Sequence, residues 1–142
     1  MTPLETRGAE IEKAVLGYVA AWNEDDPRKL QMLLEQCWAD DGVVQSNFEE
    51  IRGREALAAR ISSWRRDVPG CWALFTSGIE HHHSHFRFSG IVVRPNGERF
   101  SPALDVGELD RDGRIARIIT FHLAMGAPPA HWPRALIAPD AS

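Results

Sequence analysis

The chain changes its hydrophobic periodicity at Val68-Pro69-Gly70, and this change constrains the fold more than any other feature. Before it, apolar residues recur at the three- and four-residue intervals of amphipathic helices. After it, they occur in short runs bounded by turn signals, as in strands. Helices followed by a run of strands indicate an α+β arrangement. We expect one domain over residues 1–142, with a core at about 10–123 and an irregular tail over 124–142.

The first half of the chain predicts three helices and one short strand. Asp26 offers a side-chain cap and Pro27 suits the first position of the second helix. Asp40-Asp41-Gly42 is typical of a turn that precedes the short strand. The predicted helices cover residues 10–22, 27–36 and 54–67, and the strand covers residues 43–46.

The second half predicts an antiparallel meander of four strands. They are expected over residues 72–77, 81–94, 99–109 and 114–123. Asn96-Gly97 favours a two-residue hairpin loop in which Pro95 pairs with Glu98. This register would place Asp105 opposite Phe88, and Gly107 opposite Phe86.

Strand alternation divides the histidines of the segment His81-His82-His83-Ser84-His85. If residues 81–94 form one strand, His82 shares a face with Phe86 and Phe88, while the other three histidines share the opposite face. We therefore expect His82 and Asp105 on one apolar wall.

The element order and several motifs resemble a known family. The motifs are Tyr18-Val19-Ala20-Ala21-Trp22-Asn23, Trp38-Ala39-Asp40-Asp41-Gly42-Val43, Ile51-Arg52-Gly53-Arg54-Glu55-Ala56-Leu57, His82-His83-Ser84-His85-Phe86-Arg87-Phe88, Asp105-Val106-Gly107-Glu108-Leu109 and Asp112-Gly113-Arg114-Ile115. Over about residues 11–123 the chain is similar to the SnoaL-like, polyketide cyclase-like branch of the nuclear transport factor 2-like superfamily. The resemblance implies a cone-shaped α+β barrel, in which three N-terminal helices pack on a curved antiparallel sheet, and a homodimer formed through that sheet.

The resemblance also implies a function, although one fold of this kind supports several chemistries. It implies a pocket for a small hydrophobic molecule. We expect a cofactor-independent isomerase, cyclase or dehydratase that acts on an apolar cyclic or polyketide-like substrate by general acid–base catalysis. The alternative is a non-catalytic ligand carrier or protein-interaction module.

Three residues are candidates for catalysis. Asp105 is expected at an inward strand position, where burial would favour the protonated carboxyl and raise its pKa. His82 would exchange protons near neutral pH and be oriented by Asp105. Asp41 is the third candidate because relatives place a carboxylate near this point of the cavity.

The candidates for substrate binding are mostly aromatic. Tyr18, Trp22 and Asn23 end the first helix, and the other candidates are Trp38, Trp64, Phe86, Phe88 and His122. The side of the sheet that His122 faces is open: a two-residue loop before its strand sends it inward, and a three-residue loop with a bulge sends it outward.

A metal site is the competing chemical interpretation of the histidines. His81, His83 and His85 recur on one strand face and would need a carboxylate such as Glu80 or Glu108 as a further ligand. Three ligands from one strand are strained, so we expect neither a metal nor a cofactor.

Composition excludes other classes of function. The net charge of -4, without a basic run, argues against nucleic acid as a partner. No apolar run reaches the ~20 residues of a membrane span. The absence of a secretory pattern and the two cysteines in apolar surroundings favour a cytoplasmic protein.

Overall fold

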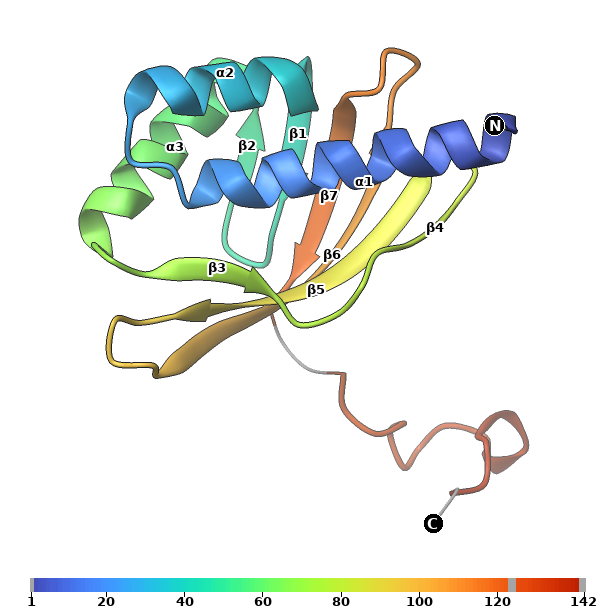
Figure 1. Cartoon of the computed structure of the whole chain (residues 1–142). Helices are drawn as coiled ribbons and strands as arrows, with labels where there is room; N and C mark the ends of the chain where they lie inside the picture. Colours follow the sequence, from blue (N-terminus) through green and yellow to red (C-terminus); the bar gives the residue numbers. More distant parts are fainter. Residues whose placement is uncertain (1, 123–124, 141–142) are drawn as a thin grey trace.

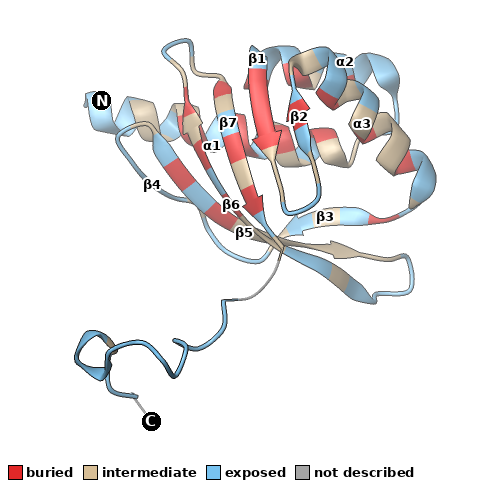
Figure 2. Cartoon of the chain, turned by 180° about the vertical axis from the view of Figure 1, so that it is seen from behind, coloured by how far each residue is buried: buried red, intermediate tan, exposed pale blue. Residues whose placement is uncertain are grey.

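The computed structural model describes residues 2–122 and 125–140, and it has three helices on one side of a curved sheet (Figure 1). The helices are α1 (Pro3–Trp22), α2 (Pro27–Cys37) and α3 (Arg54–Asp67). The strands are β1 (Trp38–Gln45), β2 (Glu50–Arg52), β3 (Trp72–Phe75), β4 (Glu80–His82), β5 (His85–Val93), β6 (Arg99–Leu109) and β7 (Ile115–Phe121). Within residues 125–140 there is one short 3-10 turn, Arg134–Leu136, and this segment leaves the body of the molecule in both whole-chain views (Figures 1 and 2).

The strands form one mixed sheet in the order β2-β1-β7-β6-β5-β3, with β4 paired to part of β5. The expected α+β fold is confirmed. The sheet is not wholly antiparallel, however, because β1 runs parallel to β7. β2 and β3 lie at its two edges, so the cone stays open on one side.

The core lies between the helices and the sheet. Ile11 and Val15 of α1 and Leu34 of α2 are fully buried, as are Ile115 and Ile118 of β7. Each such side chain contributes about 1.5–3 kcal/mol by leaving water. Seen from behind, the buried positions of the sheet concentrate on β1, β7 and the first half of β5 (Figure 2). The described residues include no helix with the length and hydropathy needed to cross a membrane.

The first helix begins seven residues before its predicted start at residue 10. Thr2 and Glu5 form a reciprocal capping box, and Pro3 occupies the first turn. The second helix begins as predicted, because the Asp26 carboxylate accepts from the backbone N–H of Arg28. The third helix has the predicted bounds.

The prediction of one strand over residues 81–94 is wrong. The chain reverses at His83-Ser84, so that His82 of β4 pairs with His85 of β5. His83 has a left-handed φ of 54°, which allows the tight turn. Alternation does not continue through a reversal, and His82 is therefore not on the face that carries Asp105.

The register of β5 and β6 is confirmed: Phe88 lies opposite Asp105, and Phe86 opposite Gly107. The predicted two-residue loop is nevertheless wrong. The Arg94 N–H donates to the Glu98 carbonyl, which leaves three residues in the loop. A bulge at Ser101-Pro102 adds one residue to β6 and restores the predicted pairing beyond it.

The predicted turn at Asp40-Asp41-Gly42 is also wrong, because these residues lie inside β1. The register of β1 against β7 shifts between Trp38 and Val43, so this part of the strand is irregular. The short strand β2 was not predicted. The last strand ends at Phe121 in the structure, and residue 123, its predicted end, lies outside the described residues.

Candidate functional site

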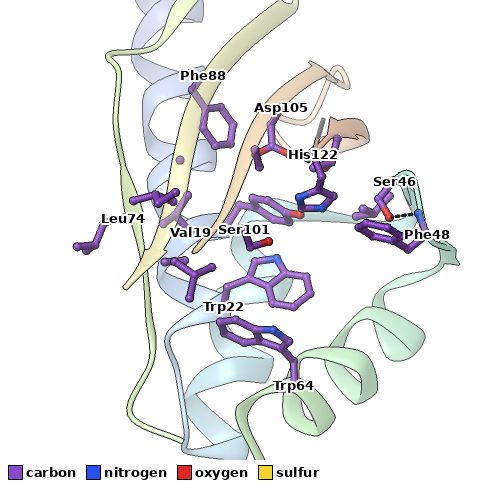
Figure 3. Close-up of a pocket in the computed structure, with 18 of the residues that line it drawn as sticks. Val19, Trp22, Ser46, Phe48, Trp64, Leu74, Phe88, Ser101, Asp105 and His122 are labelled. Carbon is purple, nitrogen blue, oxygen red and sulfur yellow. Dashed lines mark hydrogen bonds between the residues drawn. The ribbon is translucent and has the colours of Figure 1, made fainter. Parts of the chain in front are cut away.

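A cavity of about 270 Å³ lies between the helices and the inner face of the sheet (Figure 3). Its lining is mostly apolar and comes from α1, α3, all strands except β4, and the segment between β1 and β2. The lining residues used below are Tyr18, Trp22, Ser46, Phe48, Glu49, Arg60, Trp64, Phe88, Ser101, Asp105, Thr120 and His122.

Asp105 is the buried carboxyl of this cavity. It points inward from β6, is 8% exposed, and accepts a hydrogen bond from the Thr120 hydroxyl on the neighbouring strand. Burial raises the pKa of Asp105 to about 6, and this effect outweighs the opposing effects of Thr120 and His122. Near neutral pH the carboxyl therefore exchanges protons readily.

Tyr18 approaches the same cavity from α1. Its ring stacks on the Trp38 indole, with 5.3 Å between ring centroids. Burial, and then the negative charge of Asp105, raise the pKa of the Tyr18 phenol well above its usual range. The hydroxyl therefore keeps its proton and is available as a hydrogen-bond donor.

His122 lies beside Asp105 in the cavity wall (Figure 3). Its Nδ1 is 3.3 Å from the Pro102 carbonyl oxygen, which only accepts hydrogen bonds. Nδ1 is thus assigned as the donor, which leaves Nε2 as an acceptor in the neutral ring. The backbone N–H of His122 donates to Asn47 Oδ1 at 2.8 Å, and the Phe48 ring stacks on the imidazole.

His122 lies inward although its strand follows a three-residue loop with a bulge, the alternative expected to send it outward, so that expectation is wrong. The Asp110 N–H donates to the Arg114 carbonyl, so the loop contains three residues. β7 then carries an additional residue, Ala116, between the two registers with β6. This bulge reverses the facing of the strand and brings Thr120 and His122 to the side of Asp105.

The aromatic candidates fall into two groups. Trp22, Trp64 and Phe88 line the cavity with Tyr18, and the Trp22 and Trp64 rings meet edge to face with centroids 5.6 Å apart. Trp38 and Phe86 are buried in the core and are not among the lining residues. Tyr18 and Phe88 belong both to the buried core and to the cavity wall, so the sequence pattern does not separate core residues from lining residues.

Three polar candidates lie elsewhere. Asn23 forms two hydrogen bonds with the backbone of Ala73, at 2.7 and 2.8 Å, and thereby joins α1 to β3. Asp41 is exposed on β1. His82 is exposed at the β4–β5 reversal, with its Nδ1 3.1 Å from Nδ1 of His83. The expected pairing of His82 with Asp105 is therefore wrong, and neither Asp41 nor His82 reaches the cavity.

Several site residues were missed from the sequence. Thr120 could have been predicted if the register were known, because pairing of strand 99–109 with strand 114–123 places one residue of the last strand opposite Asp105. Ser101 lines the cavity from the bulge with a φ of 53°, and no turn signal marks it. Arg60 and Glu49 are brought together by tertiary packing, which spacing alone does not predict.

The histidine segment His81-His82-His83-Ser84-His85 contains the candidate metal ligands. His85 Nδ1 lies 3.9 Å from Glu108, and the His82 and His85 rings are 6.0 Å apart. Within residues 2–122 and 125–140, no three or more His, Cys, Asp or Glu side chains are grouped so as to hold an ion.

The three-helix layer, the curved mixed sheet and the cavity between them define the cone-shaped α+β class of the nuclear transport factor 2-like, or cystatin-like, fold. The family model described as SnoaL-like domain matches residues 15–118, so the chain belongs to the SnoaL-like family. No curated protein matches the chain at a significant level.

Solved structures agree with this assignment. A provisionally assigned isomerase of the SnoaL-like family from Agrobacterium tumefaciens str. C58 is 27% identical, with a TM-score of 0.76, over 82% of this chain and 99% of that one. A protein of unknown function with a cystatin-like fold from Methylobium petroleophilum PM1 is 19% identical, with a TM-score of 0.67, over 87% and 82%. A provisionally assigned polyketide cyclase from Sinorhizobium meliloti is 18% identical, with a TM-score of 0.59, over 75% and 92%. The last two similarities concern the fold alone.

Proposed function

We propose that the protein binds a small cyclic or polyketide-like ketone in this cavity and moves a proton on it by general acid–base catalysis without a cofactor. The observation that carries the proposal is Asp105, a carboxyl with a pKa of about 6 in an apolar cavity that also holds a phenol and an imidazole. A pKa near the working pH suits a group that must both accept and return a proton. The similarity to a SnoaL-like protein provisionally assigned as an isomerase supports this class of reaction.

In the proposed reaction the Asp105 carboxylate removes a proton from the carbon next to the substrate carbonyl. The C–H bond breaks, an O–H bond forms on Asp105, and the electron pair moves onto the substrate oxygen as an enolate. The Tyr18 hydroxyl donates a hydrogen bond to that oxygen and stabilises its charge. In a substrate with a C=C bond next to that carbon the enolate is a dienolate; its electrons re-form the C=O bond, the double bond shifts, and the far carbon takes the proton from Asp105, which completes an isomerisation. Cyclisation and dehydration begin with the same proton removal.

His122 is the second proton-transfer group of the proposal. Its Nε2 is the ring nitrogen that the Pro102 contact leaves as an acceptor. The Pro102 carbonyl and the stacked Phe48 ring hold the imidazole in place, so its orientation is set before a ligand arrives. A second base beside Asp105 allows proton removal and return at two different substrate atoms.

The test is solvent deuterium exchange into cyclic ketones and 1,3-diketones in D2O, followed by NMR. We expect the wild-type protein to accelerate exchange at the carbons next to the carbonyl, Asp105→Asn to lose the acceleration, and Tyr18→Phe to reduce it by about 10- to 1000-fold. Asp41→Asn is the matched control because it removes an exposed carboxylate from the same fold. Exchange that survives in Asp105→Asn would overturn the proposal, and ligand binding without any exchange would favour the carrier function.

A homodimer formed through the sheet belongs to the same proposal. The outer sheet face carries Val106, which is exposed, next to Ile119, and the exposed Phe121 next to Leu104. Sedimentation of the wild-type protein tests it. A dimer that Val106→Glu converts to a monomer supports it, and a wild-type monomer at micromolar concentration contradicts it.

A further inference from the structure

The polar groups of the cavity occupy two places that differ in chemistry. Asp105, Thr120 and His122 form an inner group on β6 and at the end of β7. Glu49 and Arg60 form an outer group, because both side chains are 37% exposed and both line the cavity. The aromatic residues Trp22, Trp64 and Phe88 line the same cavity.

Arg60 is held in the cavity wall by its own helix and by a loop. It lies four residues before Trp64 on α3, so the two side chains share one face of the helix. Its Nε donates to both carboxylate oxygens of Glu49, at 2.8 and 3.2 Å, and Glu49 belongs to the segment between β1 and β2. The guanidinium group is therefore anchored through one nitrogen.

The other two nitrogens of that guanidinium have no hydrogen-bond partner within the part of the chain that the structure describes. An arginine carries five N–H donors in a planar fork, and two parallel donors match the two oxygens of a carboxylate. Arg60 is also the single Arg or Lys among the lining residues that the structure describes. A pre-oriented guanidinium with free donors is thus present where the apolar cavity meets solvent.

We propose that the substrate of this cavity is a cyclic ketone that carries a carboxylate, with the ketone at Asp105 and the carboxylate on the free edge of Arg60. The inference rests on the proposed function for the inner end and adds a specificity-determining residue at the outer end. Glu49 has two opposing effects: it orients the guanidinium, and its negative charge repels the carboxylate of the ligand. Substitution of Glu49 by Gln removes the repelling charge and keeps a side-chain oxygen that accepts from Arg60 Nε, so it should raise the affinity for the carboxylate, whereas substitution of Arg60 should lower it.

The experiment compares two probes, 3-oxocyclohexane-1-carboxylate and its methyl ester, by NMR titration against the whole chain. We expect the wild-type protein to bind the carboxylate more tightly than the ester. Arg60→Gln lowers the affinity for the carboxylate about tenfold or more and leaves that for the ester within about twofold. Glu49→Gln raises the affinity for the carboxylate, and Arg60→Lys restores it only in part because lysine lacks the planar fork.

Arg87→Gln is the matched control. Arg87 forms an exposed ion pair with Glu80, with 3.1 Å between its Nη2 and the carboxylate, and it does not line the cavity. Its substitution by Gln changes the net charge by the same amount as Arg60→Gln and should leave the affinities for both probes unchanged. Thermal unfolding of each variant checks that folding is retained, as expected because exposed ion pairs contribute little to stability.

Three outcomes overturn the inference: equal wild-type affinity for the two probes, a preference that persists in Arg60→Gln, and no binding of either probe. Deuterium exchange into both probes separates this result from the proposed function. If deuterium exchange requires Asp105 but the preference for the carboxylate probe does not require Arg60, the inference is wrong and the proposed function stands. If the preference for the carboxylate probe requires Arg60 but no deuterium exchange is detected, the catalytic proposal is wrong and the carboxylate-binding site stands.

Discussion

Replacement of Asp105 by Asn should make the fold more stable at neutral pH. The pKa of Asp105 rises from its ordinary value of 3.8 to about 6 in the folded chain, chiefly because the carboxyl is buried. Each pH unit between the folded and unfolded values corresponds to about 1.36 kcal/mol, so the ionised carboxylate costs about 3 kcal/mol at pH 7.5. An amide avoids this cost, and its oxygen still accepts the hydrogen bond from Thr120.

The sign of the pH dependence follows from the raised pKa. Well below pH 3.8 the carboxyl is protonated in both states, and wild type and Asp105→Asn differ little. As the pH rises from about 4 to 6 the unfolded chain ionises first, so the wild type loses stability relative to the variant. Above about pH 7 the difference reaches its plateau, up to about 3 kcal/mol in favour of the variant, or about 6–10 °C in melting temperature.

Urea unfolding followed by tryptophan fluorescence, from pH 4 to pH 8, measures this difference. Contributions from other ionisable groups cancel when the variant is compared with the wild type at each pH. Asp41→Asn, a substitution at an exposed position, should change the free energy of unfolding by less than about 0.5 kcal/mol. A difference for Asp105→Asn that does not change with pH, or that favours the wild type at pH 7.5, would refute the reasoning.

Three further substitutions test other parts of the structure. Thr120→Val removes a hydrogen bond that lowers the pKa of Asp105, so the stability difference between the variant and its Asp105→Asn double variant should reach its plateau at a higher pH than in the wild-type background, and the plateau should be larger; an unchanged or smaller plateau contradicts this. Gly42→Ala should destabilise the fold by about 1–3 kcal/mol in urea unfolding, because a Cβ would lie 2.5 Å from Nε1 of Trp38; an unchanged midpoint of unfolding contradicts this. His82→Ala should leave deuterium exchange within about twofold of wild type, since the side chain is exposed outside the cavity; a large loss would return His82 to the site.

The central feature of the site was predictable from the sequence because strand pairing has few alternatives. Asp105 opposite Phe88 follows from the turn at Asn96-Gly97 and from alternation. The prediction was right although the loop has one residue more than expected, because the bulge at Ser101 compensates for it. A left-handed serine has no sequence signal, so this compensation was not predictable.

His82 shows the limit of alternation as a guide. A period of two places side chains correctly only while the strand is continuous, and the reversal at His83-Ser84 lacks the glycine or asparagine that usually marks a tight turn. For His122, alternation fails for a different reason: the strand is continuous, but a bulge at Ala116 determines which side of the sheet His122 faces. Arg60 was beyond sequence reasoning for another reason: its partner Glu49 is eleven residues away on a different element.

The pH dependence of deuterium exchange into a cyclic ketone tests the central claim most directly. In the wild-type protein the value of kcat/KM should rise with pH about a midpoint near 6, the pKa of Asp105, and level off above about pH 7. Asp105→Asn should abolish this rise together with the exchange. A rate that does not depend on pH between 5 and 8, or a wild-type profile that survives in Asp105→Asn, would contradict the account.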